Sequence, residues 1–277
     1  MTAISEIAPL TADHAAGIEF VRRPGVGHAH PLLLLHGVGS RAQNFAPLIA
    51  ALPASVDVIA WNAPGYAASQ PLTIARPQPR DYAAALERWL DTIGLRRVVL
   101  AGHSLGSLFA ASFAAHYPSR VAALALLSPA LGYGVAPGAA LPPAVQARID
   151  DINSLGAEAF AAKRAARLVY QPERKPQVLA GVQQAMAALN LTGYAQAVRA
   201  LGAGDLVADV TRITTPSLVA VGTEDVVTPP DNARTAYAAV AHGAGYHEIP
   251  DAGHAVPQEY PAAVAGLLMP LIERNDA

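Results

Sequence analysis

The chain has no cysteine and few charged residues. The lack of cysteine excludes disulfide bonds, a thiolate nucleophile and metal sites with cysteine ligands. Charged residues make up 14% of the 277 residues, against roughly 25% in typical soluble domains, and the formal net charge is −2. This balance gives no electrostatic reason to bind nucleic acid or an anionic membrane surface. We therefore expect neither nucleic acid nor membrane as a partner.

Apolar segments long enough to span a membrane are also missing. The uncharged stretch 98–119 contains His103, His116 and several serines, and the stretch 121–145 contains four prolines. Neither has the form of a spanning helix of about 20 apolar residues. Residues 1–10 include Glu6 and lack the basic and apolar regions of a signal peptide. We expect a cytoplasmic protein, and the sequence does not indicate an oligomeric state.

Short apolar runs alternate with amphipathic segments along the chain. Continuous apolar runs are typical of strands that are buried on both faces, as in parallel sheets. Strands are expected at 32–35, 56–61, 98–101, 121–127, 217–221 and 246–249. Helices are expected between them at 80–93, 105–117 and 231–240. The alternation predicts an α/β fold with a mostly parallel, doubly wound sheet and right-handed crossovers.

One long segment, 131–205, contains no strand-like run. Its helical patterns cover 142–155, 157–170, 174–189 and 193–201, with glycine and proline between them. We interpret this segment as a helical cap inserted between two strands of the sheet. The core would then consist of residues 1–130 and 206–277.

The motif Gly102-His103-Ser104-Leu105-Gly106 has the Gly-x-Ser-x-Gly form. Such a serine occupies a tight, strained turn between a strand and a helix, where side chains two residues away on either side would collide. Glycines at 102 and 106 remove those collisions. The motif follows an expected strand and begins an expected helix, which is the context that it requires. Ser104 is therefore the predicted nucleophile.

A serine hydroxyl needs a base that takes its proton and a carboxylate that orients the base. His254 follows the last expected strand, and Asp225 follows the strand before it. Glu224 would point to the opposite side of an extended segment, and Asp251 is more typical of a turn. The resulting order is serine, aspartate, histidine, and polar residues after strand ends in such sheets form ligand sites.

The same site would need donors for the negative charge that develops on a carbonyl oxygen. The backbone N–H groups of Leu105 and Val38 are the predicted donors. Val38 lies in the loop His36-Gly37-Val38-Gly39-Ser40, which follows the first apolar run. We expect the His36 ring to bond backbone groups near this loop. The His103 side chain should point away from that of Ser104.

These motifs together resemble the α/β-hydrolase superfamily over nearly the whole chain. The segments in register are 36–37, 63–66 with Ser69, 102–106, 117–121, 222–225 and 253–254. Within it, the chain resembles the enol-lactonase and small carboxylesterase branch through 164–168, 193–194, 201–206 and 228–230. Asn62 stands where the family usually has aspartate.

The resemblance implies an α/β-hydrolase fold with a helical cap and a Ser104–His254–Asp225 triad. It implies hydrolysis of a small carboxylic ester or lactone through an acyl-enzyme, without a metal or an organic cofactor. The cap would supply the substrate pocket, for which the candidate lining residues are Tyr133, Phe160, Tyr170, Met186, Leu189 and Tyr194. For each of these, ordinary helix packing is the favoured interpretation. Arg164 and Arg167 could bind a substrate carboxylate, but the pattern favours solvated charge.

Two alternative functions are compatible with the same motifs. One is a C–C bond hydrolase that acts on a vinylogous diketone, which would share the triad. The residues Val38 and His103 count against it, because that branch often has serine and asparagine at these places. The other is a non-catalytic receptor on the same fold. A complete triad at 104, 225 and 254 argues against a receptor, which could tolerate alanine there.

Overall fold

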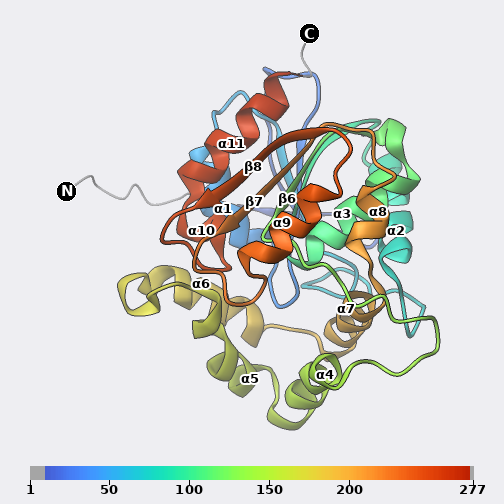
Figure 1. Cartoon of the computed structure of the whole chain (residues 1–277), viewed down its shortest axis with the longest axis vertical. Coiled ribbons are helices and arrows are strands. Elements are labelled where there is room, and N and C mark those ends of the chain that lie inside the picture. The colour runs from blue at the N-terminus through green and yellow to red at the C-terminus, as the bar shows by residue number, and fades with distance from the viewer. Residues whose placement is uncertain (1–9, 275–277) are drawn as a thin grey trace.

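The six apolar runs form the parallel strands of an eight-stranded sheet in the computed structural model, which describes residues 10–274 (Figure 1). The prediction that residues 1–10 do not form a signal peptide concerns residues that lie, apart from Leu10, outside this described range. The spatial order of the strands is β1-β2-β4-β3-β5-β6-β7-β8. From β4 to β8 every neighbouring pair is parallel. The strands are β1 (Ala12–Ala15), β2 (Ile18–Arg23), β3 (Leu32–Leu35), β4 (Val58–Trp61), β5 (Val98–His103), β6 (Val121–Leu127), β7 (Ser217–Gly222) and β8 (Gly243–Ile249).

The predicted α/β-hydrolase fold with a mostly parallel sheet is confirmed, and an antiparallel hairpin extends it. Strands β1 and β2 pair with each other, and β2 pairs antiparallel with β4. Ala16 and Gly17 form their connection with φ of 48° and 76°, as two-residue hairpin turns require. The sequence patterns do not predict this hairpin, because β1 is almost wholly exposed and has no apolar run.

Alternate side chains of the strands pack into two cores, one on each face of the sheet. Leu33 and Leu35 belong to the core that α2 and α3 cover, whereas Leu32 and Leu34 belong to the core under α1 and α11. Figure 1 shows these helix groups on opposite sides of the sheet. Their bounds are α1 (Ala46–Ala51), α2 (Pro79–Thr92), α3 (Leu105–His116), α8 (Leu206–Val210), α9 (Pro230–Ala238), α10 (Val256–Glu259) and α11 (Pro261–Glu273). Within residues 10–274, no helix combines the length and apolarity needed to cross a membrane.

Four of the five α-helices between β6 and β7 lie together beyond one end of the sheet (Figure 1). They are α4 (Pro143–Leu155), α5 (Ala157–Arg164), α6 (Pro176–Ala187) and α7 (Leu191–Ala203). The helix expected at 157–170 ends earlier, at Arg164, and a 3-10 turn (Ala165–Leu168) follows it. An antiparallel bridge joins Gly132 to Asp205 at the base of this excursion. The division of the chain into a core and a cap at 131–205 remains a prediction.

Two glycines, Gly65 and Gly193, allow α7 to pack closely against the loop that follows β4. A Cβ on Gly193 of α7 would overlap the carbonyl oxygen of Gly65, and a Cβ on Gly65 would overlap the Cα of Gly193. Gly65 also has a φ of +84°, which a residue with a side chain adopts only with strain. The backbones can approach so closely because neither residue has a side chain.

The substitution Gly193→Ala should therefore destabilise the protein by about 1–3 kcal/mol, the usual cost of overpacking a tight contact. Gly266→Ala in α11 is the matched control, since a Cβ there meets nothing within 4 Å. The control should leave stability unchanged or raise it by up to about 1 kcal/mol. Urea unfolding at neutral pH measures both variants, and equal stabilities would show that the Gly65–Gly193 contact is not restrictive.

Candidate active site

Ser104 occupies the turn between β5 and α3 with φ of 55° and ψ of −117°. A non-glycine residue holds such a conformation only when its surroundings impose it. A Cβ on Gly102 would overlap the backbone of Gly106, and a Cβ on Gly106 would overlap the carbonyl oxygen of Leu35. The two glycines are thus required sterically, and the turn presents the hydroxyl of Ser104 above the sheet.

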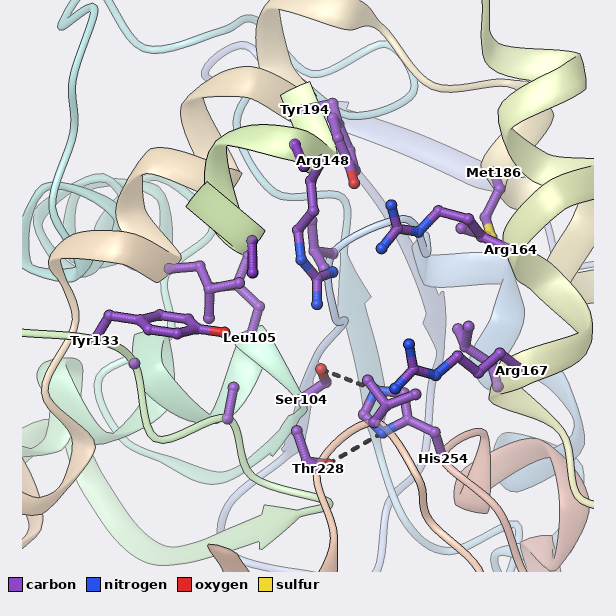
Figure 2. Close-up of a pocket in the computed structure, with 18 of the residues that line it drawn as sticks. Ser104, Leu105, Tyr133, Arg148, Arg164, Arg167, Met186, Tyr194, Thr228 and His254 are labelled. Carbon is purple, nitrogen blue, oxygen red and sulfur yellow. Dashed lines mark hydrogen bonds between the residues drawn. The ribbon is translucent and has the colours of Figure 1, made fainter. Parts of the chain in front are cut away.

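Three loops bring Ser104, His254 and Asp225 together, although they are far apart in the sequence. The Ser104 Oγ lies 3.0 Å from His254 Nε2, and His254 Nδ1 lies 2.9 Å from Asp225 Oδ2. Figure 2 shows the first of these bonds at the floor of a pocket. All three residues are buried, with exposed fractions of 5%, 4% and 2%. This is the arrangement in which a histidine can accept the proton of a serine hydroxyl.

The surroundings of Asp225 keep its carboxylate charged. Its Oδ1 accepts hydrogen bonds from the N–H groups of Val227 (2.8 Å) and Thr228 (2.9 Å). Burial raises the pKa of Asp225, but attraction to His254 and these hydrogen bonds outweigh burial and lower the pKa to about 2. A charged acceptor at Nδ1 keeps a proton on that nitrogen. The Nε2 nitrogen is then free to accept from Ser104.

Thr228 is a further polar residue at the site. Its hydroxyl lies 3.0 Å from Asp225 Oδ2 and 2.9 Å from the Ser128 carbonyl oxygen, either of which can accept its single hydrogen. It also lies 3.1 Å from His254 Nδ1, from which it can accept. None of the sequence motifs assigns a role to Thr228. The feature of the sequence that could have identified it is its position three residues after Asp225, because the carboxylate of an aspartate in a turn commonly bonds backbone N–H groups that follow it.

The two rival carboxylates lie elsewhere. Glu224 is exposed and accepts a hydrogen bond from the Thr223 hydroxyl at 3.3 Å. Asp251 is an exposed turn residue with a φ of 57°, and its carbonyl oxygen accepts from Lys175. Neither carboxylate bonds to His254 in the described structure.

The loop that follows β3 lies against Ser104. A Cβ on Gly37 would be 2.8 Å from the Cβ of Ser104, so only glycine permits this approach. Val38 and Leu105 both line the pocket, and within residues 10–274 neither backbone N–H has an acceptor. The two unpaired donors match the requirement for holding a negatively charged oxygen.

His36 links this loop to the neighbouring one. Its Nδ1 lies 2.9 Å from the Gly37 carbonyl oxygen, and its Nε2 accepts from the Ala63 N–H at 3.0 Å. Burial lowers the pKa of His36 to about 4. The ring is therefore neutral at neutral pH, with one nitrogen donating and the other accepting, and it acts as a structural bridge.

His103 supports the loop that carries His254. Its Nε2 lies 2.7 Å from the carbonyl oxygen of His254, to which it donates, and the two rings are 5.0 Å apart. Burial, assisted by the nearby His254, lowers the pKa of His103 to about 3. The side chain thus bonds the backbone of the histidine that faces Ser104.

Glu259 connects the His254 loop to the helices beyond the sheet. Its carboxylate is fully buried and accepts from the N–H groups of Gly253 (3.0 Å) and Tyr170 (3.2 Å). Lys175 balances its charge at 2.7 Å. The Ala255 N–H also donates to the Leu168 carbonyl oxygen at 2.8 Å. The position of His254 is thus tied to the segment between α5 and α6.

A cavity of about 580 Å³ opens above Ser104. Of the predicted lining residues, Tyr133, Met186 and Tyr194 border it, as Figure 2 shows. Phe160, Tyr170 and Leu189 do not border this cavity and face other neighbours, as the favoured interpretation of ordinary packing predicts. Phe160 is fully buried and packs edge-on against Tyr194, Tyr170 lies beside Lys175, and Leu189 is buried among apolar neighbours.

Charged side chains make up much of the upper wall of the cavity. Arg148, Lys163, Arg164 and Arg167 border it together with a single acid, Asp151. The sequence favours solvated charge for Arg164 and Arg167. Arg164 at the end of α5 is half-buried and Arg167 in the following 3-10 turn is exposed, and both border the cavity (Figure 2). Arg148 on α4 carries no sequence motif that would have identified it. Among residues 10–274, no three histidine or acidic side chains gather in a way that could hold a metal ion.

Known proteins share this fold and, in part, this sequence. A model of the alpha/beta hydrolase fold matches residues 30–259. An (E)-2-((N-methylformamido)methylene)succinate hydrolase from Acinetobacter baylyi is 31% identical over 201 residues, which cover 72% of this chain and 74% of that protein.

Two solved structures resemble the chain over almost its whole length. A thermophilic esterase from Thermogutta terrifontis, with malate bound, has a TM-score of 0.82 at 24% identity, covering 97% of this chain and 98% of the esterase. The enol-lactonase from Burkholderia xenovorans LB400 has the same TM-score and identity, covering 95% of this chain and all of the lactonase. At this identity the likeness establishes the fold.

The neutral state of His103 predicts a loss of stability in acid. Its pKa of about 3 in the folded chain lies below the ordinary 6.5. The unfolded chain therefore takes up the proton first, and stability falls as the pH drops below about 6.5. Between pH 7 and pH 5 this amounts to about 2 kcal/mol. Urea unfolding at both pH values should show a smaller loss for His103→Gln than for the wild type.

The exposed His242 provides the control for this measurement. His242→Gln should keep the pH dependence of the wild type. If His103→Gln shows the same loss as His242→Gln, the buried ring does not titrate as described.

Proposed function

We propose that this chain, which belongs to the alpha/beta hydrolase fold family, is a serine hydrolase that cleaves a small carboxylic ester or lactone. The continuous hydrogen-bonded chain from Ser104 Oγ to His254 Nε2 (3.0 Å) and from His254 Nδ1 to Asp225 (2.9 Å) carries the proposal. The family predicted from the sequence is confirmed by the match over residues 30–259. The Acinetobacter relative is named as a hydrolase, which agrees with hydrolysis as the type of reaction.

The geometry supports acyl transfer to water in two steps. In the first, Ser104 Oγ attacks the carbonyl carbon while His254 Nε2 takes the hydroxyl proton. The Val38 and Leu105 N–H groups would hold the negatively charged oxygen of the tetrahedral intermediate. His254 then gives its proton to the alkoxide as the C–O bond breaks. In a lactone that alkoxide stays attached to the acyl group.

A water molecule repeats the sequence on the acyl-enzyme. His254 takes a proton from the water, whose oxygen attacks the acyl carbon, and then returns the proton to Ser104 Oγ as the acyl–serine bond breaks. Asp225 stabilises the imidazolium form of His254 in both steps, because its lowered pKa keeps the carboxylate charged. Thr228 would hold the Asp225 carboxylate and the His254 ring in line.

The cavity size agrees with a small substrate. Pockets that bind small molecules typically measure roughly 300–1,000 Å³, and this one measures about 580 Å³. Ser104 and the two residues with unpaired N–H groups, Val38 and Leu105, all border this space. A carbonyl group at this place could meet the nucleophile and the donors at once.

The first test is hydrolysis of a series of short p-nitrophenyl esters by the wild type and by Ser104→Ala. The wild type should be active, and Ser104→Ala should lose activity by about 10⁴-fold or more, as removal of such a nucleophile usually does. The exposed Ser119 gives the matched control, and Ser119→Ala should keep full activity. A fluorophosphonate probe should label the wild type and Ser119→Ala but not Ser104→Ala.

A folded wild type that neither cleaves any ester nor reacts with the probe would contradict the proposal. Because a C–C bond hydrolase would keep the activated serine, probe labelling without ester cleavage would favour C–C bond hydrolysis, whereas the absence of both would favour ligand binding. Loss of a coloured dienolate substrate would then identify the former.

A second test concerns Thr228. Thr228→Val keeps the shape of the side chain but removes the hydroxyl that bonds Asp225 and His254. Because hydrogen bonds to charged groups contribute about 1.5–3 kcal/mol, kcat should fall about 10- to 100-fold with little change in KM. Thr228→Ser should restore most of the rate. A Thr228→Val variant with the kcat of the wild type would exclude a positioning role.

A further inference from the structure

The cavity carries an excess of positive charge that the whole chain does not have. Four cationic side chains, Arg148, Lys163, Arg164 and Arg167, share its wall with one acidic side chain, Asp151. The chain as a whole has a formal net charge of −2. The wall of this cavity is therefore positively charged, although the chain as a whole is slightly acidic.

The cations are only partly neutralised by protein groups. Asp151 bonds both Lys163 and Arg164, each at 3.0 Å. Arg167 donates to the carbonyl oxygen of Val226 at 3.1 Å, which carries no net charge. In the part of the chain that the structure describes, no carboxylate lies within ion-pair distance of Arg148. Two guanidinium groups thus lack a charged partner.

The three arginines come from different segments and meet over the nucleophile. Arg148 belongs to α4, Arg164 ends α5, and Arg167 lies in the following 3-10 turn. Figure 2 shows their guanidinium groups entering the cavity and facing the space above Ser104. Like charges in a partly buried cavity repel each other, so such a cluster is costly until an anion binds.

Tyr194 adds a neutral donor to this group. Its side chain reaches the cavity between Arg148 and Arg164 (Figure 2). Burial raises the pKa of Tyr194, and the two arginines oppose this shift only in part. The hydroxyl thus stays protonated at neutral pH and can donate to an anion.

We propose that the substrate of this hydrolase carries a carboxylate, which Arg148, Arg164 and Arg167 hold on the wall that faces Ser104. Planar guanidinium groups match carboxylate oxygens with paired, charge-assisted hydrogen bonds. The carboxylate would be at the end of the substrate opposite to the ester or lactone carbonyl. This inference rests on the proposed hydrolase function, because it assigns a substrate class to the same cavity.

A pair of esters of equal shape tests the charge preference. The p-nitrophenyl monoester of adipic acid has a carboxylate at its far end, and p-nitrophenyl 6-methylheptanoate has an uncharged isopropyl group there. The wild type should show a kcat/KM at least about tenfold higher for the charged ester, the effect expected of one charge-assisted hydrogen bond.

Variants of single arginines then assign the preference to residues. The ratio of the two kcat/KM values should fall about tenfold in Arg148→Met and in Arg164→Met. Arg97→Met is the matched control, because Arg97 is exposed and immediately precedes β5, at the end of the strand opposite to Ser104. The control should keep the ratio of the wild type.

Calorimetric titration tests the anion site without catalysis. Wild-type protein should bind adipate more tightly than its uncharged diamide. Arg148→Met should weaken adipate binding about tenfold, and Arg97→Met should not.

The outcomes separate the two proposals. If the wild type cleaves the neutral ester as well as the charged one and does not favour adipate over the diamide, the substrate class is wrong and the hydrolase function stands. If neither ester is cleaved but adipate binds through Arg148, the anion site stands and the hydrolase function is wrong.

Discussion

The strained backbone at Ser104 is the constraint on which the rest of the site depends. A φ of 55° at a serine costs on the order of 1–3 kcal/mol, and the surrounding structure must supply it. The Ser104 N–H donates to the Leu127 carbonyl oxygen at 2.9 Å, and Gly106 packs directly on the backbone of β3. Strands buried on both faces hold these atoms in place. The hydroxyl is therefore positioned by the sheet rather than by a mobile loop.

Control of charge is the second condition for the proposed reaction. During catalysis His254 becomes positively charged, and the His103 ring lies only 5.0 Å away. Because burial keeps the pKa of His103 at about 3, this second ring stays neutral and does not oppose the charging of His254. Asp225 remains ionised for the opposite reason, since its partners outweigh its burial. Because His103 stays neutral and Asp225 stays charged, the proton of Ser104 is directed to Nε2 of His254.

The sequence predicts a functional residue well when a local pattern identifies it, and poorly when its role depends on tertiary packing. Ser104, Asp225 and His254 each stand at a strand end, and local patterns locate strand ends well. Arg148 could not be found in this way, because its role depends on how α4 packs over the sheet. Phe160 and Tyr170 illustrate the same limit, because a helical pattern does not show which of its side chains face a cavity. The sequence patterns do not predict the hairpin of β1 and β2, because an exposed edge strand needs no apolar run.

In the proposed mechanism the sheet carries the reacting groups and the helices beyond it carry the anion site, so the contacts between these two regions are important. The nucleophile and its donors lie on the sheet, whereas the arginines lie on α4, α5 and the turn after it. Glu259 bonds the backbone on both sides, at Gly253 next to His254 and at Tyr170 beyond α5. A shift of the arginine-bearing segment would therefore act on the loop that carries His254. Since small displacements of reacting groups greatly reduce rates, binding of the proposed substrate anion would be coupled to the alignment of His254 through the buried carboxylate of Glu259.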